Sequence, residues 1–310
     1  MTVPIFAVLG DLYVAQGLLR ALAPSEAQVR VLCPDEAAAR EVLAAGQAGA
    51  TDVKAVQGSP DAPEVLDQLL AGARSVAFLS PVGLSGRSWR PQTHIADLKR
   101  VFECAAAHGV ARFLYLSSPA ASSKARAACL REAEQAEKLV SAAPLTDYCL
   151  RAAPVVGRGD PLLRSIARQA ARPGPLAVVW GYADTTLQPI HVDDLGLCLA
   201  RLVAGAGPLK PGTYCVAGPD TVTVMDLLDR AAALRGRHKV KIHIPLFILG
   251  LVALVRTLCG PKRAARFRER VLLLSAGFQA DKNDWPALCG PAQKPRPLRE
   301  AEQEAREAEG

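Results

Sequence analysis

Residues 5–19 read IFAVLGDLYVAQGLL, and this stretch decides the fold. An apolar run over 5–9 leads into the dipeptide Gly10-Asp11, and a helical pattern begins near Val14. A strand, a tight glycine turn and a helix N-terminus together form the unit that binds the pyrophosphate of a dinucleotide. We therefore expect the first βα unit of a Rossmann-type sheet at the start of the chain.

The same alternation continues through the first half of the chain. Apolar strands are expected at 5–9, 29–33, 53–56, 75–79, 112–116 and 148–150, and helices at 14–22, 36–45, 63–71, 94–108 and 125–140. Continuous apolar strands separated by helices of this length form parallel βαβ units with right-handed crossovers. The predicted fold is α/β, a doubly wound parallel sheet with a smaller C-terminal α/β lobe.

The second half of the chain is less regular and predicts three parts for the whole molecule. We expect a dinucleotide-binding domain over 1–155 and a smaller substrate or docking lobe, interleaved with the sheet, over 156–290. The last part, 291–310, is polar, and we expect a solvated helix or a disordered tail there. A strand before Pro245, a helix to about 258 and a second helix from 262 are predicted within the lobe.

Charge and composition exclude several classes of protein. The 310 residues carry a net charge of +7, but ten basic residues and one acid, Glu269, lie between 235 and 270, so that segment alone carries +9. A charged fraction of 22% and a mean hydropathy of +0.14 argue against disorder. Nucleic acid is not the expected partner, because Phe267 is the only aromatic residue of the basic cluster 262–270.

The cysteine pattern and the apolar runs bear on compartment and metal binding. None of the eight cysteines has CxxC spacing, and several lie inside apolar runs, where cysteine packs as a small hydrophobe. A signal-peptide pattern does not precede the first expected strand, so we expect a reducing, cytoplasmic compartment. HExxH and a cysteine quartet are missing from the sequence, so no metal site is expected. The longest apolar run, 244–255, is too short to span a bilayer.

Several motifs resemble those of the atypical and extended short-chain dehydrogenase/reductases, and they keep the family's order over about residues 3–290. GDLYVAQGLL at 10–19 resembles the fingerprint TGATGFVGxxL, and GVARFLYLSS at 109–118 resembles GVKRFVYLSS. LRAAPVVGRG at 150–159, QPIHVDD at 188–194 and YCVAGP at 214–219 resemble three later family motifs. The resemblance is to the epimerase/dehydratase-like branch and to the branch of the complex I accessory subunit.

The resemblance implies a bound NAD(P)(H). Its cofactor-binding positions fall on Gly10, Leu12, Tyr13, Val14, Asp35, Ser80, Pro81, Ser117 and Pro154. The fingerprint is nevertheless damaged, because one residue and the middle glycine are missing and Asp11 adds a negative charge near an anionic ligand. Asp35 either meets a ribose hydroxyl, which favours NAD over NADP, or caps the helix that begins at Glu36.

The family's catalytic pair does not occur in this chain. Active members use a tyrosine as acid/base and a lysine four residues later, which one helical turn places on the same face. None of the five tyrosines is followed by such a lysine, and the two positions fall on Cys129 and Ala133. Ser118 matches the substrate-orienting serine, or it satisfies backbone at a strand end. Cys129 is either a nucleophile or a buried structural thiol.

Two further groups of residues admit two interpretations each. His191 with Asp193 and Asp194 is either a ligand cluster or a helix cap. The apolar run 244–255 is either a lobe helix packed on the sheet or part of a docking surface for an anionic membrane or an acidic partner. The basic residues of that docking surface are Lys239, Lys241, Arg256, Lys262, Arg263, Arg266, Arg268 and Arg270.

Three functions follow from these patterns. The first is an NAD(P)(H)-binding protein, non-catalytic or weakly catalytic, with a structural or redox-sensing role. The second is an oxidoreductase or nucleotide-sugar epimerase-like enzyme with a non-standard acid/base group. The third is a nucleotide-free scaffold that docks on a membrane surface, which would make the cytoplasmic protein peripheral to that membrane, or on a protein complex.

Overall fold

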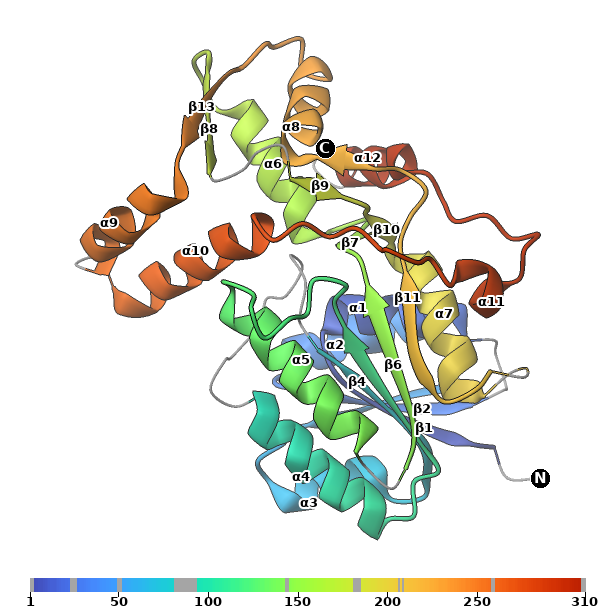
Figure 1. The fold of residues 1–310 in the computed structure, drawn as a ribbon. Coiled ribbons are helices and arrows are strands. Elements are labelled where there is room, and N and C mark those ends of the chain that lie inside the picture. The colour runs from blue at the N-terminus through green and yellow to red at the C-terminus, as the bar shows by residue number, and fades with distance from the viewer. Residues whose placement is uncertain are drawn as a thin grey trace.

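The computed structural model describes residues 3–22, 27–48, 52–80, 94–142, 145–180, 185–205, 207, 209–257 and 260–307. Its centre is a seven-stranded sheet in the order β11-β6-β5-β4-β1-β2-β3, with every neighbouring pair parallel (Figure 1). The strands are β1 (Ile5–Gly10), β2 (Gln28–Cys33), β3 (Asp52–Gln57), β4 (Ala73–Leu79), β5 (Arg112–Ser117), β6 (Thr146–Ala152) and β11 (Gly212–Val216). The prediction of a doubly wound parallel α/β sheet is confirmed.

The order of the strands reverses between β1 and β4. From β1 the chain builds one half of the sheet through β2 and β3, and from β4 it builds the other half through β5, β6 and β11. In doubly wound sheets a ligand binds beyond the carboxyl ends of the strands at this switch point. Gly10 lies at that edge and pairs with Leu79, the last residue of β4. Ser80 follows Leu79 directly.

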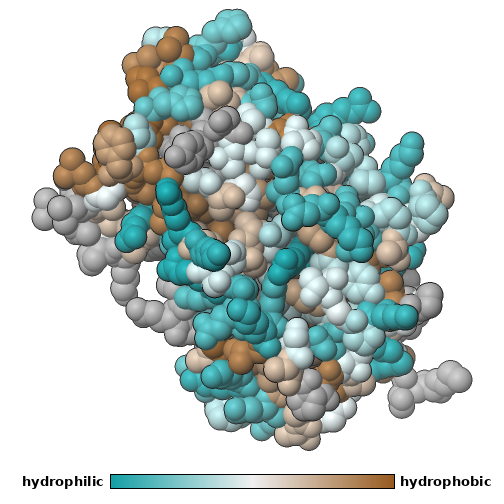
Figure 2. Space-filling view, in the orientation of Figure 1, coloured by the Kyte–Doolittle hydropathy of each residue, from teal (hydrophilic) through white to brown (hydrophobic). Residues whose placement is uncertain are grey.

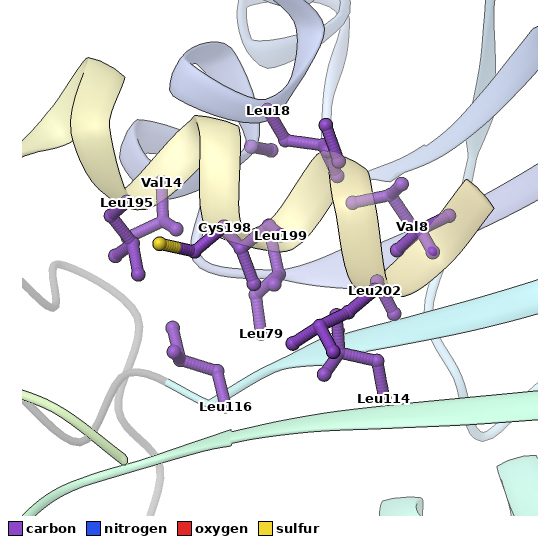
Figure 3. Close-up of a cluster of buried hydrophobic side chains, with 14 of the residues drawn as sticks. Val8, Val14, Leu18, Leu79, Leu114, Leu116, Leu195, Cys198, Leu199 and Leu202 are labelled. Atoms are coloured by element: carbon purple, nitrogen blue, oxygen red, sulfur yellow. The ribbon is translucent and has the colours of Figure 1, made fainter. Parts of the chain in front are cut away.

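Helices cover both faces of the sheet (Figure 1). One face carries α1 (Leu12–Ala21), α2 (Glu36–Ala48) and α7 (Val192–Ala204), and the other carries α3 (Pro63–Leu70), α4 (His94–Ala107) and α5 (Ala128–Ser141). Figure 3 shows the core between the sheet and the first set, where Leu18, Leu195 and Leu199 lie among strand side chains.

Glycines let α1 and α7 approach closely. A Cβ on Gly17 would lie 2.4 Å from the carbonyl oxygen of Val192, and one on Gly196 would lie 2.2 Å from that of Gly17. Neither helix can accept a larger residue at this crossing without shifting backbone. The packing ties the first helix of the sheet domain to a helix from the second half of the sequence.

The rest of the chain forms a lobe above the carboxyl edge of the sheet. Its strands are β7 (Val155–Val156) with β10 (Ile190–His191), β9 (Thr186–Leu187) with β12 (Val222–Thr223), and β8 (Leu176–Trp180) with β13 (Val240–Ile244). Its helices are α6 (Pro161–Ala171), α8 (Val224–Ala233), α9 (Leu246–Thr257), α10 (Pro261–Leu274) and α12 (Leu298–Glu307). The short helix α11 (Trp285–Cys289) instead packs against α7 in the core beside the sheet (Figure 1). The strand and two helices predicted around Pro245 are present as β13, α9 and α10, whereas β11 returns to the main sheet.

Within the predicted polar tail, 298–307 form a helix, α12, with one face packed against the lobe. Leu298 and Ala301 of α12 are buried, and the backbone N–H of Leu298 donates to Asp220 Oδ2 at 2.7 Å. Three small or apolar residues at helical spacing give this charged segment one buried face, which its overall polarity conceals. None of the described helices is long and apolar enough to cross a membrane.

Candidate functional site

The turn between β1 and α1 is closed by the side chain of Asp11. Its Oδ1 accepts hydrogen bonds from the backbone N–H of Tyr13 at 2.9 Å and of Val14 at 3.3 Å. The backbone N–H of Asp11 donates to the carbonyl of Leu79 at 2.7 Å, and only 5% of the residue is exposed. Burial raises the pKa of this carboxyl. The first amides of α1, which would face a bound anion, are therefore engaged by a carboxylate of the chain itself.

Gly10 is required at this turn by its close approach to β4. It has a φ of +112°, and a Cβ there would lie 2.0 Å from the carbonyl oxygen of Leu79. No other residue type could adopt this backbone without moving the strand end. The first glycine of the fingerprint thus has a structural role here, and the half-buried Leu12 begins α1 directly after the cap.

The other predicted cofactor residues at the sheet edge are engaged within the protein. Asp35 Oδ1 accepts a hydrogen bond from the backbone N–H of Ala38 at 2.8 Å. This is the helix-capping interpretation of Asp35, with the carboxylate at the start of α2. The carbonyl of Pro154 accepts from the N–H of Ile190 at 2.9 Å. Pro81 lies outside the described residues.

A buried polar cluster at the end of β4 contains a histidine that the sequence analysis missed. His94 Nε2 lies 3.3 Å from Ser80 Oγ and 3.1 Å from the hydroxyl of Tyr115. Burial lowers the pKa of His94 to about 4, so the ring is neutral at neutral pH. Phe78 packs edge-on against the ring. The sequence signal that could have found this cluster is His94 itself, a histidine at the start of the amphipathic helix α4.

Ser117 belongs to a charged network beneath the carboxyl edge of the sheet. Its hydroxyl donates to Glu137 Oε1 at 2.5 Å, and Arg151 donates to both oxygens of the same carboxylate, at 2.9 and 2.6 Å. The Glu137 side chain is one-tenth exposed. The network ties β5, α5 and β6 together. Sequence reasoning overlooked Glu137, although an acid on the apolar face of a helix predicts a buried partner.

The buried face of α5 presents Cys129, Ala133 and Glu137 at successive turns. The first two occupy the positions that the family resemblance assigns to tyrosine and lysine. The backbone N–H of Cys129 donates to Glu269 Oε1 at 2.9 Å. Burial, with the nearby charge of Glu269, raises the pKa of the Cys129 thiol far above its usual range. A neutral buried thiol is a poor nucleophile, so this face offers no standard acid/base pair.

Ser118 is fully buried at the end of β5. Its Oγ accepts a hydrogen bond from the backbone N–H of Ala120 at 3.3 Å. The contact fits the interpretation in which Ser118 pairs with backbone at the end of the strand. Beyond it, a cleft of about 420 Å³ separates the β5–α5 connection from the lobe. The cleft is lined by Pro119, Ala120, Ala125, Thr186, Ala276, Gly277, Gln279 and Asp281.

His191 acts as a helix cap within an ion-pair network. Its Nδ1 accepts from the backbone N–H of Asp193 at 3.2 Å, and its Nε2 lies 3.2 Å from Glu304 Oε2 on α12. Asp193 also pairs with Arg20 at 2.7 Å and with Arg296 at 2.8 Å. Two arginines beside the carboxylate oppose a cation here, so the capping interpretation fits and the ligand interpretation does not.

The predicted docking residues divide into three groups. Lys239 is buried and donates to the carbonyls of Arg172 and Gly174 at 2.6 and 2.7 Å, and Lys241 pairs with Asp229. Two basic residues of α10 are exposed, Arg268 and Arg270, and the guanidinium of Arg270 donates to the carbonyl of Pro161 on α6 at 3.5 Å. The side chains of Arg256, Lys262, Arg263 and Arg266 lie outside the described residues.

Apolar side chains are exposed in the same region. Phe247 and Leu251 on α9 are 83% and 64% exposed. The paired strands β8 and β13 add four more exposed apolar residues, Leu176, Val178, Val240 and Ile242. Figure 2 shows brown, hydrophobic side chains gathered at the end of the lobe that β8, β13 and α9 form in Figure 1. We call these six residues the apolar end.

Solved structures with the same fold cover nearly the whole chain. NADPH-dependent quinone oxidoreductase QOR2 from Escherichia coli, complexed with NADPH, aligns at a TM-score of 0.71 and 18% identity over 96% of this chain and 98% of that one. Triphenylmethane reductase from Citrobacter sp., complexed with NADP(H), aligns at a TM-score of 0.68 and 19% identity over 97% of this chain and 99% of that one. A nucleoside-diphosphate-sugar epimerase from Staphylococcus aureus aligns at a TM-score of 0.68 and 14% identity over 97% of this chain and 99% of that one.

No family model and no curated protein matches the sequence. The structural likeness nevertheless establishes the class of fold. The chain has the Rossmann-type α/β fold of these two reductases and this epimerase, as its motifs predicted.

The turn at β1 does not fit a dinucleotide in the arrangement described. A pyrophosphate at the switch point needs free amides at the start of α1 and close approach of the backbone. Asp11 occupies two of those amides and places a carboxylate where the phosphates would lie. A dinucleotide can use this site only after the Asp11 side chain leaves the helix end.

Proposed function

We propose that this chain is a non-catalytic or weakly catalytic short-chain dehydrogenase/reductase-like protein with a structural or sensing role. The observation that carries the proposal is the buried face of α5, where Cys129 and Ala133 take the tyrosine and lysine positions. Hydride transfer to or from a carbonyl needs a proton donor held beside the reacting oxygen. Cys129 is a poor substitute, because it is buried and its raised pKa makes the thiol a weak proton donor.

NAD(P)(H) is the ligand we propose for the switch point, at reduced affinity. The fold and the glycine turn support it, and structures of the same fold contain NADPH or NADP(H). Asp11 opposes it, because phosphate oxygens must replace a carboxylate on two amides. Calorimetry with NAD, NADH, NADP and NADPH tests the ligand. Millimolar binding of one pair supports it, and absence of heat with all four rejects it and leaves a nucleotide-free scaffold.

A second candidate function is docking of the apolar end on an anionic lipid surface. The observation that favours it is the exposure of Phe247 and Leu251 on α9, which packs against α10, where Arg268 is also exposed. Apolar side chains flanked by basic ones bind the interface of an anionic bilayer.

Flotation with phosphatidylserine vesicles tests this docking. The double variant Phe247→Ser with Leu251→Ser should float less than the parent chain. The matched control is Leu234→Ser, because Leu234 is 53% exposed but lies at the end of α8 outside the apolar end. Equal flotation of parent and double variant would reject lipid docking through this surface.

A further inference from the structure

Three side chains with metal-binding donors meet on the face of the sheet that carries α3, α4 and α5, opposite the face that carries α7. Asp67 on α3 and Cys104 and His108 at the end of α4 place their donor atoms within 4.8 Å of one another. His108 Nε2 lies 2.9 Å from Asp67 Oδ1, and Cys104 Sγ lies 3.6 Å from the same oxygen. Among the residues that the structure describes, no other such group occurs.

The backbone holds these three donors on rigid elements. Cys104 and His108 are one helical turn apart, and the N–H of His108 donates to the carbonyl of Cys104 at 3.0 Å. Gly109, with a φ of +67°, ends the helix directly after them. Both helices are anchored in the core beneath, α3 by Leu66 and Leu69 among others and α4 by a similar apolar face.

A thiolate, an imidazole and a carboxylate form a donor set that suits Zn²⁺. Zinc takes four ligands at about 2.0–2.3 Å in a tetrahedron, so its ligand atoms lie about 3.3–3.8 Å apart. The sulfur–oxygen separation of 3.6 Å already matches, and the nitrogen–oxygen pair must open by a few tenths of an ångström. Asp67 is well exposed, so its carboxylate can make that adjustment.

We propose that Asp67, Cys104 and His108 bind one Zn²⁺, with water at the fourth position. The metal would join α3 to α4 and cover the Cys104 thiol. The three residues form no sequence motif, because the carboxylate comes from another helix, 37 residues before the cysteine.

Cobalt is the probe, since Co²⁺ replaces Zn²⁺ and a thiolate ligand gives it an intense charge-transfer band. The reduced full-length chain, free of any histidine tag, is titrated with Co²⁺ and then with Zn²⁺. We expect one equivalent of Co²⁺ to produce the thiolate band and Zn²⁺ to abolish it. Cys104→Ser should remove the band, and His108→Gln should weaken binding by about tenfold or more.

The matched control is Cys215→Ser, which changes the other half-buried cysteine of the described chain. It should keep the cobalt band. Thermal melting adds a second readout, because Zn²⁺ should raise the Tm of the parent chain and of Cys215→Ser but not that of Cys104→Ser. A parent chain without the thiolate band, or a band that survives in Cys104→Ser, would overturn the proposal.

Discussion

Replacing Asp11 with glycine changes the one side chain that closes the helix end at the switch point. The substitution removes the carboxylate from the amides of Tyr13 and Val14 and leaves their N–H groups free for a phosphate. It also removes a negative charge from the path of an anionic ligand. We therefore expect Asp11→Gly to bind NAD(P)(H) more tightly than the parent chain does.

The structure sets the size of this effect. Each hydrogen bond between an amide and a charged acceptor contributes about 1.5 kcal/mol, so two amides give about 3 kcal/mol. Since each 1.4 kcal/mol is a factor of ten, the affinity should rise by about 100-fold. Because the same two hydrogen bonds cap α1 in the ligand-free protein, Asp11→Gly should also lower the free energy of unfolding, by up to about 3 kcal/mol.

Isothermal titration calorimetry with all four dinucleotides measures the gain, and urea unfolding checks the fold. Asp11→Asn is the matched control, because the amide oxygen still caps α1 while the charge is lost. Its gain should be clearly smaller than that of the glycine variant. If folded Asp11→Gly binds no more tightly than the parent chain, within threefold, the reasoning about the occupied helix end is refuted.

Three further predictions concern stability. Glu137→Ala strands the guanidinium of Arg151 and should lower the free energy of unfolding in urea by about 3 kcal/mol, the low end for a broken buried pair because Arg151 is one-third exposed; a loss under 1 kcal/mol would contradict this. Gly17→Ala should cost about 1–3 kcal/mol, whereas Gly250→Ala on α9, which has open space, should stabilise the fold by up to about 1 kcal/mol; equal effects would contradict the close crossing of α1 and α7. Burial raises the pKa of Asp160 to about 7, so the fold favours its protonated form, and its contribution to stability should be present below about pH 4 and disappear as the pH rises to about 7. Asp160→Asn keeps the cap of α6, and the free energy of unfolding in urea should then depend less on pH between about 4 and 7; an unchanged dependence on pH would contradict the raised pKa of Asp160.

The sheet could be predicted from the sequence because each βα unit is local. The apolar run before Gly10 and the helical spacing after it are one signal within fifteen residues, and five later strands repeat it. The sequence did not predict that β11 joins the main sheet, because its neighbour β6 lies more than sixty residues earlier in the chain. Its short apolar run gives no local signal for that pairing.

The candidate site could be predicted only in part, because its contacts join distant elements. The loss of the tyrosine and lysine was visible in the sequence. The sequence also showed the charge of Asp11, but not that its carboxylate binds the first amides of α1. The partnership of Glu137 with Arg151 joins a helix to a strand, and only the fold brings them together.

Dinucleotide turnover by the unmodified chain tests the absence of standard catalysis most directly. Purified protein is mixed with NADPH or NADH and a quinone, and cofactor oxidation is followed by absorbance, with Ser118→Ala alongside. The account predicts a rate at or only slightly above that of the mixture without protein, and the same rate in both chains. Oxidation that requires the protein and is lost in Ser118→Ala would contradict it, because that result would reveal a working hydride-transfer site beside a buried Cys129 and Ala133.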